Sequence, residues 1–359
     1  MDPGLTELLE TEQYSLRAPA KEALLLGALN RLTAHHRRRC PEYARILDAA
    51  YPGLCEASGI ADVPYLPVAL FKWVQLKSVD DVDVFKVMTS SGTTSSAVSR
   101  IYLDVETATA QTRALASIVT HYLGKKRRPM LIIDHPGVIK DRKEVSARGA
   151  GILGMMSYGR DHLYALDADM QVDRAAVDSW LASHAGEELL IFGFTFMVWE
   201  YFYEILRENG LDLSRATLVH SGGWKKLADR AVSKETFRTG LSRAFGLTRV
   251  HDFYGMVEQV GSVFFECPAG YFHPPNFADV LIRDPRTWRP AAIGDKGVVE
   301  VVSLLPLSYP GHALLTEDIA VVEGVDDCEC GRMGKRFRVN GRVPKAEIRG
   351  CSDTYEHRD

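Results

Sequence analysis

The 359-residue sequence has no apolar run long enough to cross a bilayer. Its longest apolar stretches, such as LLIFGFTFMVW at 189–199, are well short of the roughly 20 residues that a membrane helix needs. The first residues, MDPGLTELLETEQ, are acidic and have no charged-then-apolar signal pattern. We therefore expect a cytoplasmic protein without a membrane span, whose six cysteines are thiols or metal ligands rather than disulfides.

The chain also has no strong excess of charge of either sign. The net charge is −4, with 46% hydrophobic and 25% charged residues, as in an ordinary globular protein. The basic clusters HHRRRC (35–40) and KKRR (125–128) are short and are expected to be solvated surface, so we expect no nucleic-acid partner. Internal repeats, low-complexity tracts and obvious linkers are missing, and the length suits one large domain or two ordinary ones.

A Walker phosphate loop is missing as well, because no GK[ST] motif occurs. The chain has instead the stretch MTSSGTTSSAVSR at 88–100, which is rich in hydroxyl side chains around Gly92. Such a run is a poor helix, since serine and threonine compete for backbone groups, and it has little apolar surface to bury. Two interpretations stay open: a surface loop, or a phosphate cradle of hydroxyl and backbone N–H donors.

The order of the predicted elements indicates an α/β domain. The first 50 or so residues have apolar positions at helical spacing. Strand-like and helical segments then alternate, which is typical of a largely parallel sheet. The predicted strands are VFKVMTS (84–90), PMLIIDH (129–135), ELLIFGF (188–194), ATLVHSGG (216–223) and TRVHDFYG (248–255), and the predicted helices include 103–123, 172–183, 196–209 and 233–245.

Three loops that follow predicted strands, SSGTTSS, HSGGWKK and YGMVEQ, could meet at one edge of this sheet, where ligands bind in such folds. After about residue 260, short β-branched runs separated by glycine, proline and aspartate indicate a β-rich subdomain. We therefore expect four segments. They are a helical segment at 1–60, an α/β nucleotide- and acyl-binding core at 61–260, a β-rich subdomain at 261–342 and a short tail at 343–359.

Four motifs occur in a recognisable order: TSSGTT (89–94), YGMVE (254–258), LLTEDIA (314–320) and NGR (340–342). This order resembles the adenylate-forming superfamily of acyl ligases. More narrowly, LPVALFKW, SSGTT, YGMVEQ, TEDIA and AEIRGCSDTYE resemble the LuxE-type acyl-protein synthetases of bacterial fatty acid reductase systems. The resemblance extends over about residues 60–355. It implies the fold of the adenylate-forming N-terminal domain, with mixed and parallel sheets, a small β-rich subdomain and a truncated C-terminal domain.

The resemblance also implies a nucleotide site. Its phosphate loop maps to Ser90, Ser91, Gly92, Thr93 and Thr94. In many relatives this loop is followed by a glycine and a lysine, which are absent here. Arg100 would supply the positive charge instead.

The other implied site residues come from later motifs. Tyr254 would stack on adenine and Gly255 would permit close approach, while Glu258 would hold magnesium. The residue before Glu258 is Val257, where many relatives have threonine. Asp318 would accept hydrogen bonds from the ribose hydroxyls, Arg342 would lie near ribose or phosphate, and Gly222 and Gly223 would line the adenine and acyl sites. Residues 194–199 are either an acyl wall or ordinary helix packing.

LuxE-type enzymes are understood to pass the acyl group to a cysteine near the carboxyl end, which here would be Cys351. A thiolate is the nucleophile, and the cations of Arg349 and Lys345 would lower its pKa. The alternative is a thiol without a role. Longer ligases of this superfamily have a mobile domain with a catalytic lysine after the hinge. From the resemblance we expect a truncated form of this domain, in which Lys345, another residue or a partner would replace that lysine.

Cys267, His273, Cys328 and Cys330 occur as C-x5-H followed by C-x-C-G. This set can close a tetrahedral structural zinc site, and related phenylacetate-CoA-ligase-like enzymes resemble it. Unliganded buried thiols are the alternative.

The implied activity is activation of a carboxylic acid, by resemblance a fatty acid, as acyl-AMP with ATP and Mg²⁺. The acyl group would then pass to a thiol and on to an acceptor protein (a reductase or carrier) or a small molecule. Two alternatives stay open. One is a phenylacetate-CoA-ligase-like enzyme that uses coenzyme A or a carrier-protein thiol, and the other is a non-catalytic nucleotide-binding subunit.

Overall fold

The computed structural model describes residues 3–90, 98–139, 147–208, 210–224 and 230–343. The described chain forms two compact units. The first contains residues 3–90, 98–122 and 255–343, and the second contains the described residues from 123 to 254. Within the described residues, the structure has no helix that is both long and apolar enough to span a membrane.

The first unit is built on antiparallel strands in the order β11-β12-β13-β14-β10-β9, with β1 parallel to β13. A separate antiparallel pair is formed by β2 and β3. The strands are β1 (Leu66–Pro67), β2 (Lys86–Thr89), β3 (Arg100–Leu103), β9 (Phe264–Glu266), β10 (Phe272–His273), β11 (Ala278–Arg283), β12 (Lys296–Ser303), β13 (Ala313–Val325) and β14 (Lys335–Arg342). Three short 3₁₀ turns of this unit are Ile60–Asp62, Val68–Lys72 and Val257–Gln259.

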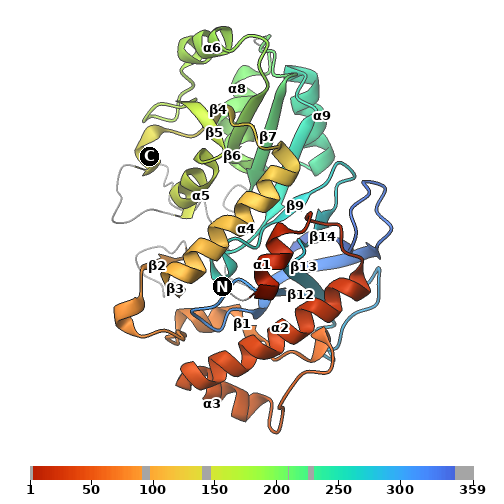
Figure 1. Cartoon of the computed structure of the whole chain (residues 1–359). Coiled ribbons are helices and arrows are strands. Elements are labelled where there is room, and N and C mark those ends of the chain that lie inside the picture. The colour runs from red at the N-terminus through yellow and green to blue at the C-terminus, as the bar shows by residue number, and fades with distance from the viewer. Residues whose placement is uncertain (1–2, 91–97, 140–146, 209, 225–229, 344–359) are drawn as a thin grey trace. The chain divides into compact units, whose positions relative to one another are not determined.

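The helices of the first unit are α1 (Pro3–Glu10), α2 (Ala18–Arg39), α3 (Pro41–Ala50) and α4 (Val105–Leu123), whose last residue belongs to the second unit. Helix α2 has proline in its first turn and a basic last turn, both of which favour a helix at those positions. Its buried positions, including Leu25, Leu29 and His36, recur every three to four residues. Helices α2 and α3 lie side by side (Figure 1).

The second unit is a parallel sheet in the order β8-β7-β6-β4-β5. Its strands are β4 (Arg128–Ile133), β5 (Gly159–Tyr164), β6 (Leu189–Phe194), β7 (Ala216–Ser221) and β8 (Arg249–Tyr254). Its helices are α5 (Ala147–Met156), α6 (Arg174–Ser183), α7 (Thr195–Met197), α8 (Glu204–Leu206) and α9 (Lys234–Phe245). Every residue of β6 is buried, as expected for a strand covered on both faces by helices (Figure 1).

Two sequence expectations need correction. The strand before the hydroxyl run, β2, is not part of the parallel sheet but of the β2–β3 hairpin, so only the loops after β7 and β8 share an edge of that sheet. The helix expected at 196–209 is interrupted by a π-helical turn at Val198–Tyr203 between α7 and α8. Bulky aromatic side chains such as Trp199 and Phe202 are buried there. Periodicity alone does not distinguish the wider turn from an α-helix.

Candidate functional site

The hydroxyl run is held closed at its two ends. The backbone N–H of Ser99 donates to Ser90 Oγ at 2.9 Å, and the N–H of Ser90 donates to the Ser99 carbonyl at 3.2 Å. Ser99 itself is fully buried. Ser91, Gly92, Thr93 and Thr94 lie outside the described residues, as do Lys345 and Cys351. The structure therefore fixes the base of the predicted phosphate loop.

Glu258 is a buried carboxyl group in the 3₁₀ turn Val257–Gln259. Burial raises its pKa above the usual value for glutamate, because the charged form loses its hydration. The Ser99 hydroxyl and the Lys72 cation act in the opposite direction, while the charge of Glu317 raises the pKa further. A cation held near the Glu258 carboxyl group would favour its charged form, as the Lys72 charge already does in part.

Asp318 and Arg342 face each other across β13 and β14. They are partners in the strand register, and Arg342 Nε lies 3.5 Å from Asp318 Oδ1. The backbone N–H of Asp318 donates to Thr316 Oγ1 at 3.1 Å, and Gly341 beside Arg342 has a φ of 119°. The aspartate is thus held by its own strand pair, with most of its side chain shielded from solvent.

The second unit places Gly222, Gly223 and Tyr254 at the carboxyl ends of two adjacent parallel strands. Ser221 and Phe253 are register partners at the ends of β7 and β8, and Ser221 Oγ donates to the Phe253 carbonyl at 2.8 Å. This is the edge where ligands bind in parallel sheets. The YGMVE motif divides here, since Tyr254 belongs to the second unit and Gly255 to the first.

Gly222 and Gly223 have different surroundings. Gly222 has a φ of 83°, and a Cβ added there would lie 3.2 Å from Cδ1 of Phe194. An added Cβ on Gly223 would meet nothing within 4 Å. The first glycine is therefore required by the backbone and by the Phe194 ring, whereas the second leaves open space.

The predicted acyl wall at 194–199 is buried throughout. Trp199 stacks on Tyr203 with ring centroids 4.1 Å apart and is tilted against Phe237 at 5.7 Å. These contacts are those of helix packing, while Phe194 lies against a predicted site residue, Gly222. The acyl wall stays a prediction.

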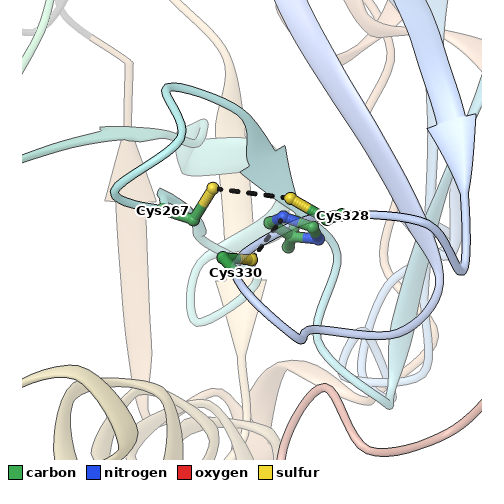
Figure 2. Close-up of side chains that lie close together, drawn as sticks. Cys267, Cys328 and Cys330 are labelled. Atoms are coloured by element: carbon green, nitrogen blue, oxygen red, sulfur yellow. Dashed lines mark hydrogen bonds between the residues drawn. The ribbon is translucent and has the colours of Figure 1, made fainter.

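The four predicted zinc ligands lie together in the first unit. Their ligand atoms are all within 4.8 Å of one another. Cys267 Sγ is 4.0 Å from Cys328 Sγ, and Cys330 Sγ is 3.5 Å from His273 Nε2 (Figure 2). Bond lengths of about 2.3 Å to sulfur and 2.1 Å to nitrogen give tetrahedral edges of about 3.8 and 3.6 Å. The measured separations fit a Cys₃His zinc tetrahedron.

Two tight turns present these cysteines. Gly270 N–H donates to the Cys267 carbonyl and Gly331 N–H donates to the Cys328 carbonyl, each at 2.9 Å. Both glycines have φ near 80°, which a residue with a Cβ adopts only with strain. Each C-x-x-G turn therefore aims a thiol inward from a different hairpin, β9–β10 in one case and β13–β14 in the other.

The histidine of this cluster is kept neutral by its surroundings. Burial lowers the pKa of His273 to about 4, and the nearby cations of Arg332, Lys21 and Arg336 lower it in the same direction. Neutral imidazole is the form that binds a metal. Arg332 lies over the Tyr122 ring at 4.3 Å, so the cluster is packed against α4.

Sequence reasoning missed Lys72, Ser99 and Glu317 as neighbours of Glu258. All three lie inside stretches already noted: Lys72 in LPVALFKW, Glu317 in LLTEDIA and Ser99 in MTSSGTTSSAVSR. Their position within those motifs was the available signal, but only the folded chain lets all three act on the same carboxyl group.

Comparison with solved structures defines the class of the fold. A structure of 2-hydroxyisobutyryl-CoA ligase in an open conformation, in complex with 2-HIB-AMP and CoA, matches 94% of this chain and 78% of its own, with a TM-score of 0.68 at 18% identity. The same ligase in the postadenylation state matches with a TM-score of 0.67. The chain has the mixed α/β fold of an adenylate-forming ligase, as the sequence predicted.

A model of the family "Acyl-protein synthetase, LuxE" matches residues 7–358, and the chain belongs to this family. Two similar proteins are long-chain-fatty-acid–luciferin-component ligases. The one from Vibrio harveyi is 25% identical over 324 residues, covering 84% of this chain and 81% of that protein. The one from Aliivibrio fischeri is 22% identical over 277 residues, covering 74% and 71%. The predictions of the family and of an enzyme, an acyl-activating ligase, are confirmed, and the non-catalytic interpretation is wrong.

Proposed function

We propose that this enzyme activates a fatty acid with ATP as an acyl-adenylate and passes the acyl group through a thiol to an acceptor. The observation that carries the proposal is the grouping in the first unit of the closed base of the hydroxyl run with the buried Glu258. The similarity to ligases named for long-chain fatty acids supports the substrate class.

The first step joins the acid to AMP. A carboxylate oxygen of the acid attacks the α-phosphorus of ATP, the bond to the β-phosphate oxygen breaks, and pyrophosphate leaves. Residues 90–94 would hold the β- and γ-phosphates, and Arg342 would lie near the ribose or phosphate. Asp318 would accept hydrogen bonds from the ribose hydroxyls, and its pairing with Arg342 fixes its orientation before the nucleotide arrives.

The surroundings of Glu258 fit a magnesium ion, because a buried carboxyl group next to Glu317 is more easily ionised beside a divalent cation. Glu258 would hold the ion through a hard oxygen ligand. When bound, magnesium neutralises phosphate charge. Tyr254 would stack on adenine, and Gly222 and Gly223 would leave room for the nucleotide. Gly255 would permit close approach of the chain.

The second step transfers the acyl group. A thiolate attacks the carbonyl carbon of the adenylate, the bond to the phosphate oxygen breaks, and AMP leaves as the thioester forms. Cys351 is the thiol that we propose, with Lys345 and Arg349 favouring its ionised form. The final acceptor would be a partner protein, a reductase or carrier, or a small molecule.

The Cys₃His cluster would hold a structural zinc ion. All four ligand positions come from the protein, so no position is open for a substrate. Cys267, His273, Cys328 and Cys330 would join the β9–β10 hairpin to the turn between β13 and β14.

The decisive experiment combines pyrophosphate release with intact mass after incubation with ATP, Mg²⁺ and a panel of carboxylic acids. The expected result is pyrophosphate release together with a mass gain of one acyl group. The mass gain is lost in Cys351→Ala but kept in Cys55→Ala. Cys55 is an exposed cysteine and serves as the control. Full pyrophosphate release by a Glu258→Gln, Asp318→Asn double variant would contradict the proposal.

A second candidate acceptor is coenzyme A, because the structural neighbour is a CoA ligase that was crystallised with CoA. In that case an acyl-CoA product forms when CoA is added, and Cys351→Ala retains the activity. Pyrophosphate release with neither a protein adduct nor acyl-CoA would indicate an acceptor other than these two.

A further inference from the structure

A buried connection links β12 to β13 in the first unit. Residues 304–312, which we call the 304–312 segment, have no regular secondary structure, yet all of them except Leu307 are buried. Connections usually run over the surface, because buried backbone groups need partners. The hydrogen bonds of this segment therefore indicate what it holds in place.

Its first set of contacts is with the turn that contains Glu258. Tyr309 is fully buried, and its hydroxyl donates to the Glu258 carbonyl at 2.9 Å. Gln259 Nε2 donates to the Gly311 carbonyl at 2.7 Å. A Cβ on Gly311 would lie 2.3 Å from the Tyr309 ring and 3.1 Å from the Glu258 carbonyl oxygen, so only glycine lets the chain approach this closely.

Its second set of contacts is with β3, the strand that follows the hydroxyl run, and with Ser78. Ser308 Oγ donates to the carbonyl of Tyr102, in the middle of β3, at 2.8 Å. The Ser308 carbonyl accepts from the Ser78 N–H at 2.7 Å. Ser99, whose hydroxyl lies near the Glu258 carboxyl group, comes directly before β3.

Its third set of contacts is with helix α2. His312 Nε2 and Thr33 Oγ1 are 2.9 Å apart, and His36 Nε2 lies 3.1 Å from the Pro306 carbonyl. The two imidazole rings are stacked with centroids 5.1 Å apart. The segment is thus fixed at both ends, and Tyr309 between them has little freedom to move.

We infer that Tyr309 is a positioning residue for acid activation, which sets the backbone of Glu258 and through it the direction of the carboxyl group. The inference deepens the proposed function and rests on it. Tyr309 bonds the carbonyl, not the carboxyl group, of Glu258, so it acts on the site through Glu258. A displacement of about 1 Å in the position of a metal-holding carboxylate strongly lowers the rate of the reaction. Removal of a buried hydroxyl group elsewhere has only a structural effect.

The test compares Tyr309→Phe with Tyr51→Phe. Tyr51 also donates to a backbone carbonyl of the first unit, that of Tyr65 at 3.1 Å, and serves as the matched control. Pyrophosphate release is measured against Mg²⁺ concentration, together with the melting temperature. We expect about tenfold lower kcat and a higher half-saturating Mg²⁺ concentration for Tyr309→Phe. The control retains wild-type kinetics, and the KM for the acid is unchanged in both variants. Equal kinetics of the two variants would overturn the inference.

A second measurement separates this inference from the proposed function. Binding of Mn²⁺ with a non-hydrolysable ATP analogue, followed by electron paramagnetic resonance, is expected to be weaker in Tyr309→Phe than in Tyr51→Phe. If the wild type releases no pyrophosphate with any acid, the proposed function fails, and equal Mn²⁺ binding then overturns the inference as well. If Tyr309→Phe melts much earlier than the control, Gln259→Met is compared instead. Gln259→Met must show the same rise in half-saturating Mg²⁺ for the inference to stand.

Discussion

The two compact units hold their candidate site residues by different means. In the first, Ser90, Glu258 and Asp318 depend on hydrogen bonds and charges from other parts of the chain, namely Ser99, Tyr309 and Arg342. In the second, Gly222 and Tyr254 follow the ends of adjacent parallel strands, so the sheet register itself positions them. The difference teaches that the first unit should respond to changes of charge and hydrogen bonding, and the second to changes of steric bulk.

The largest expected effect concerns the Cys₃His cluster of the first unit, where we propose a zinc ion. Cys328→Ser removes one of four ligands, and structural zinc contributes on the order of 10 kcal/mol in small zinc domains. We expect the bound zinc to fall from one per chain to near zero, by inductively coupled plasma mass spectrometry, and the melting temperature to fall sharply. Cys55→Ser, at an exposed thiol, is expected to keep both values. Wild-type protein without zinc would contradict the site.

The next effect concerns the charge of Glu258. Glu258→Gln keeps the shape but removes the ionisable group, and we expect pyrophosphate release to fall about 100-fold or more. Because burial raises the pKa of Glu258, its carboxyl group holds a proton to higher pH than an exposed glutamate. Without excess Mg²⁺, the rate of pyrophosphate release by the wild type should therefore still rise with pH above the usual range of glutamate pKa values. The exposed Glu56→Gln is the control, and an equal loss in both variants would refute the role of Glu258.

A third effect concerns the pH dependence of stability in the first unit. Burial lowers the pKa of His312 to about 3, so between pH 6.5 and 3 the unfolded chain binds a proton that the folded chain does not. Its contribution to stability is present above pH 6.5 and is lost as the pH falls. We expect the free energy of unfolding to decrease by about 2 kcal/mol from pH 7 to pH 5 through this group.

Denaturant titrations of the wild type and His312→Gln at several pH values test this expectation. The variant should be less stable at pH 7 and should lose less stability on acidification. His36, which stacks on His312, also has a lowered pKa and contributes in the same direction, so some slope remains in the variant. Identical slopes in both proteins would show that His312 does not titrate on unfolding.

The smallest expected effect concerns two glycines of the second unit, Gly222 and Gly223. Gly222→Ala places a Cβ 3.2 Å from the Phe194 ring at a φ of 83°, whereas Gly223→Ala meets no atom within 4 Å. We expect Gly222→Ala to destabilise the protein by about 1–2 kcal/mol and to raise the KM for ATP. Gly223→Ala should alter the melting temperature little. An equal response of the two variants would remove the distinction between these glycines.

Elements with a strong local signal were predicted well. The sequence indicated a helix at 103–123, and α4 runs from Val105 to Leu123, with Asp104 Oδ1 accepting from the Thr107 N–H at its start. The helix expected at 233–245 is α9, capped by Ser233 and ended by Gly246 at a φ of 66°. Both helices have the capping residues and periodicity that fix a helix locally.

The grouping of residues was predicted unevenly. The Cys₃His spacing pointed to one cluster, because thiols and imidazole in such a pattern have few other uses, and the structure brings the four ligand atoms together. Neither the placement of β2 in a hairpin nor the π-helical turn at Val198–Tyr203 had a sequence signal, since a strand pattern does not name its pairing partner.

By itself the sequence determined the alternation of strands and helices, the family motifs and the identity of the charged residues and of the candidate metal ligands. Only the tertiary structure decided which of them meet. Lys72, Ser99 and Glu317 act on the pKa of Glu258, and Tyr309 bonds its carbonyl, although these residues are separated by up to 245 positions (72 to 317) in the chain. The physical reason is that burial and Coulomb interactions depend on distance in space, which long-range strand pairing sets and local sequence does not.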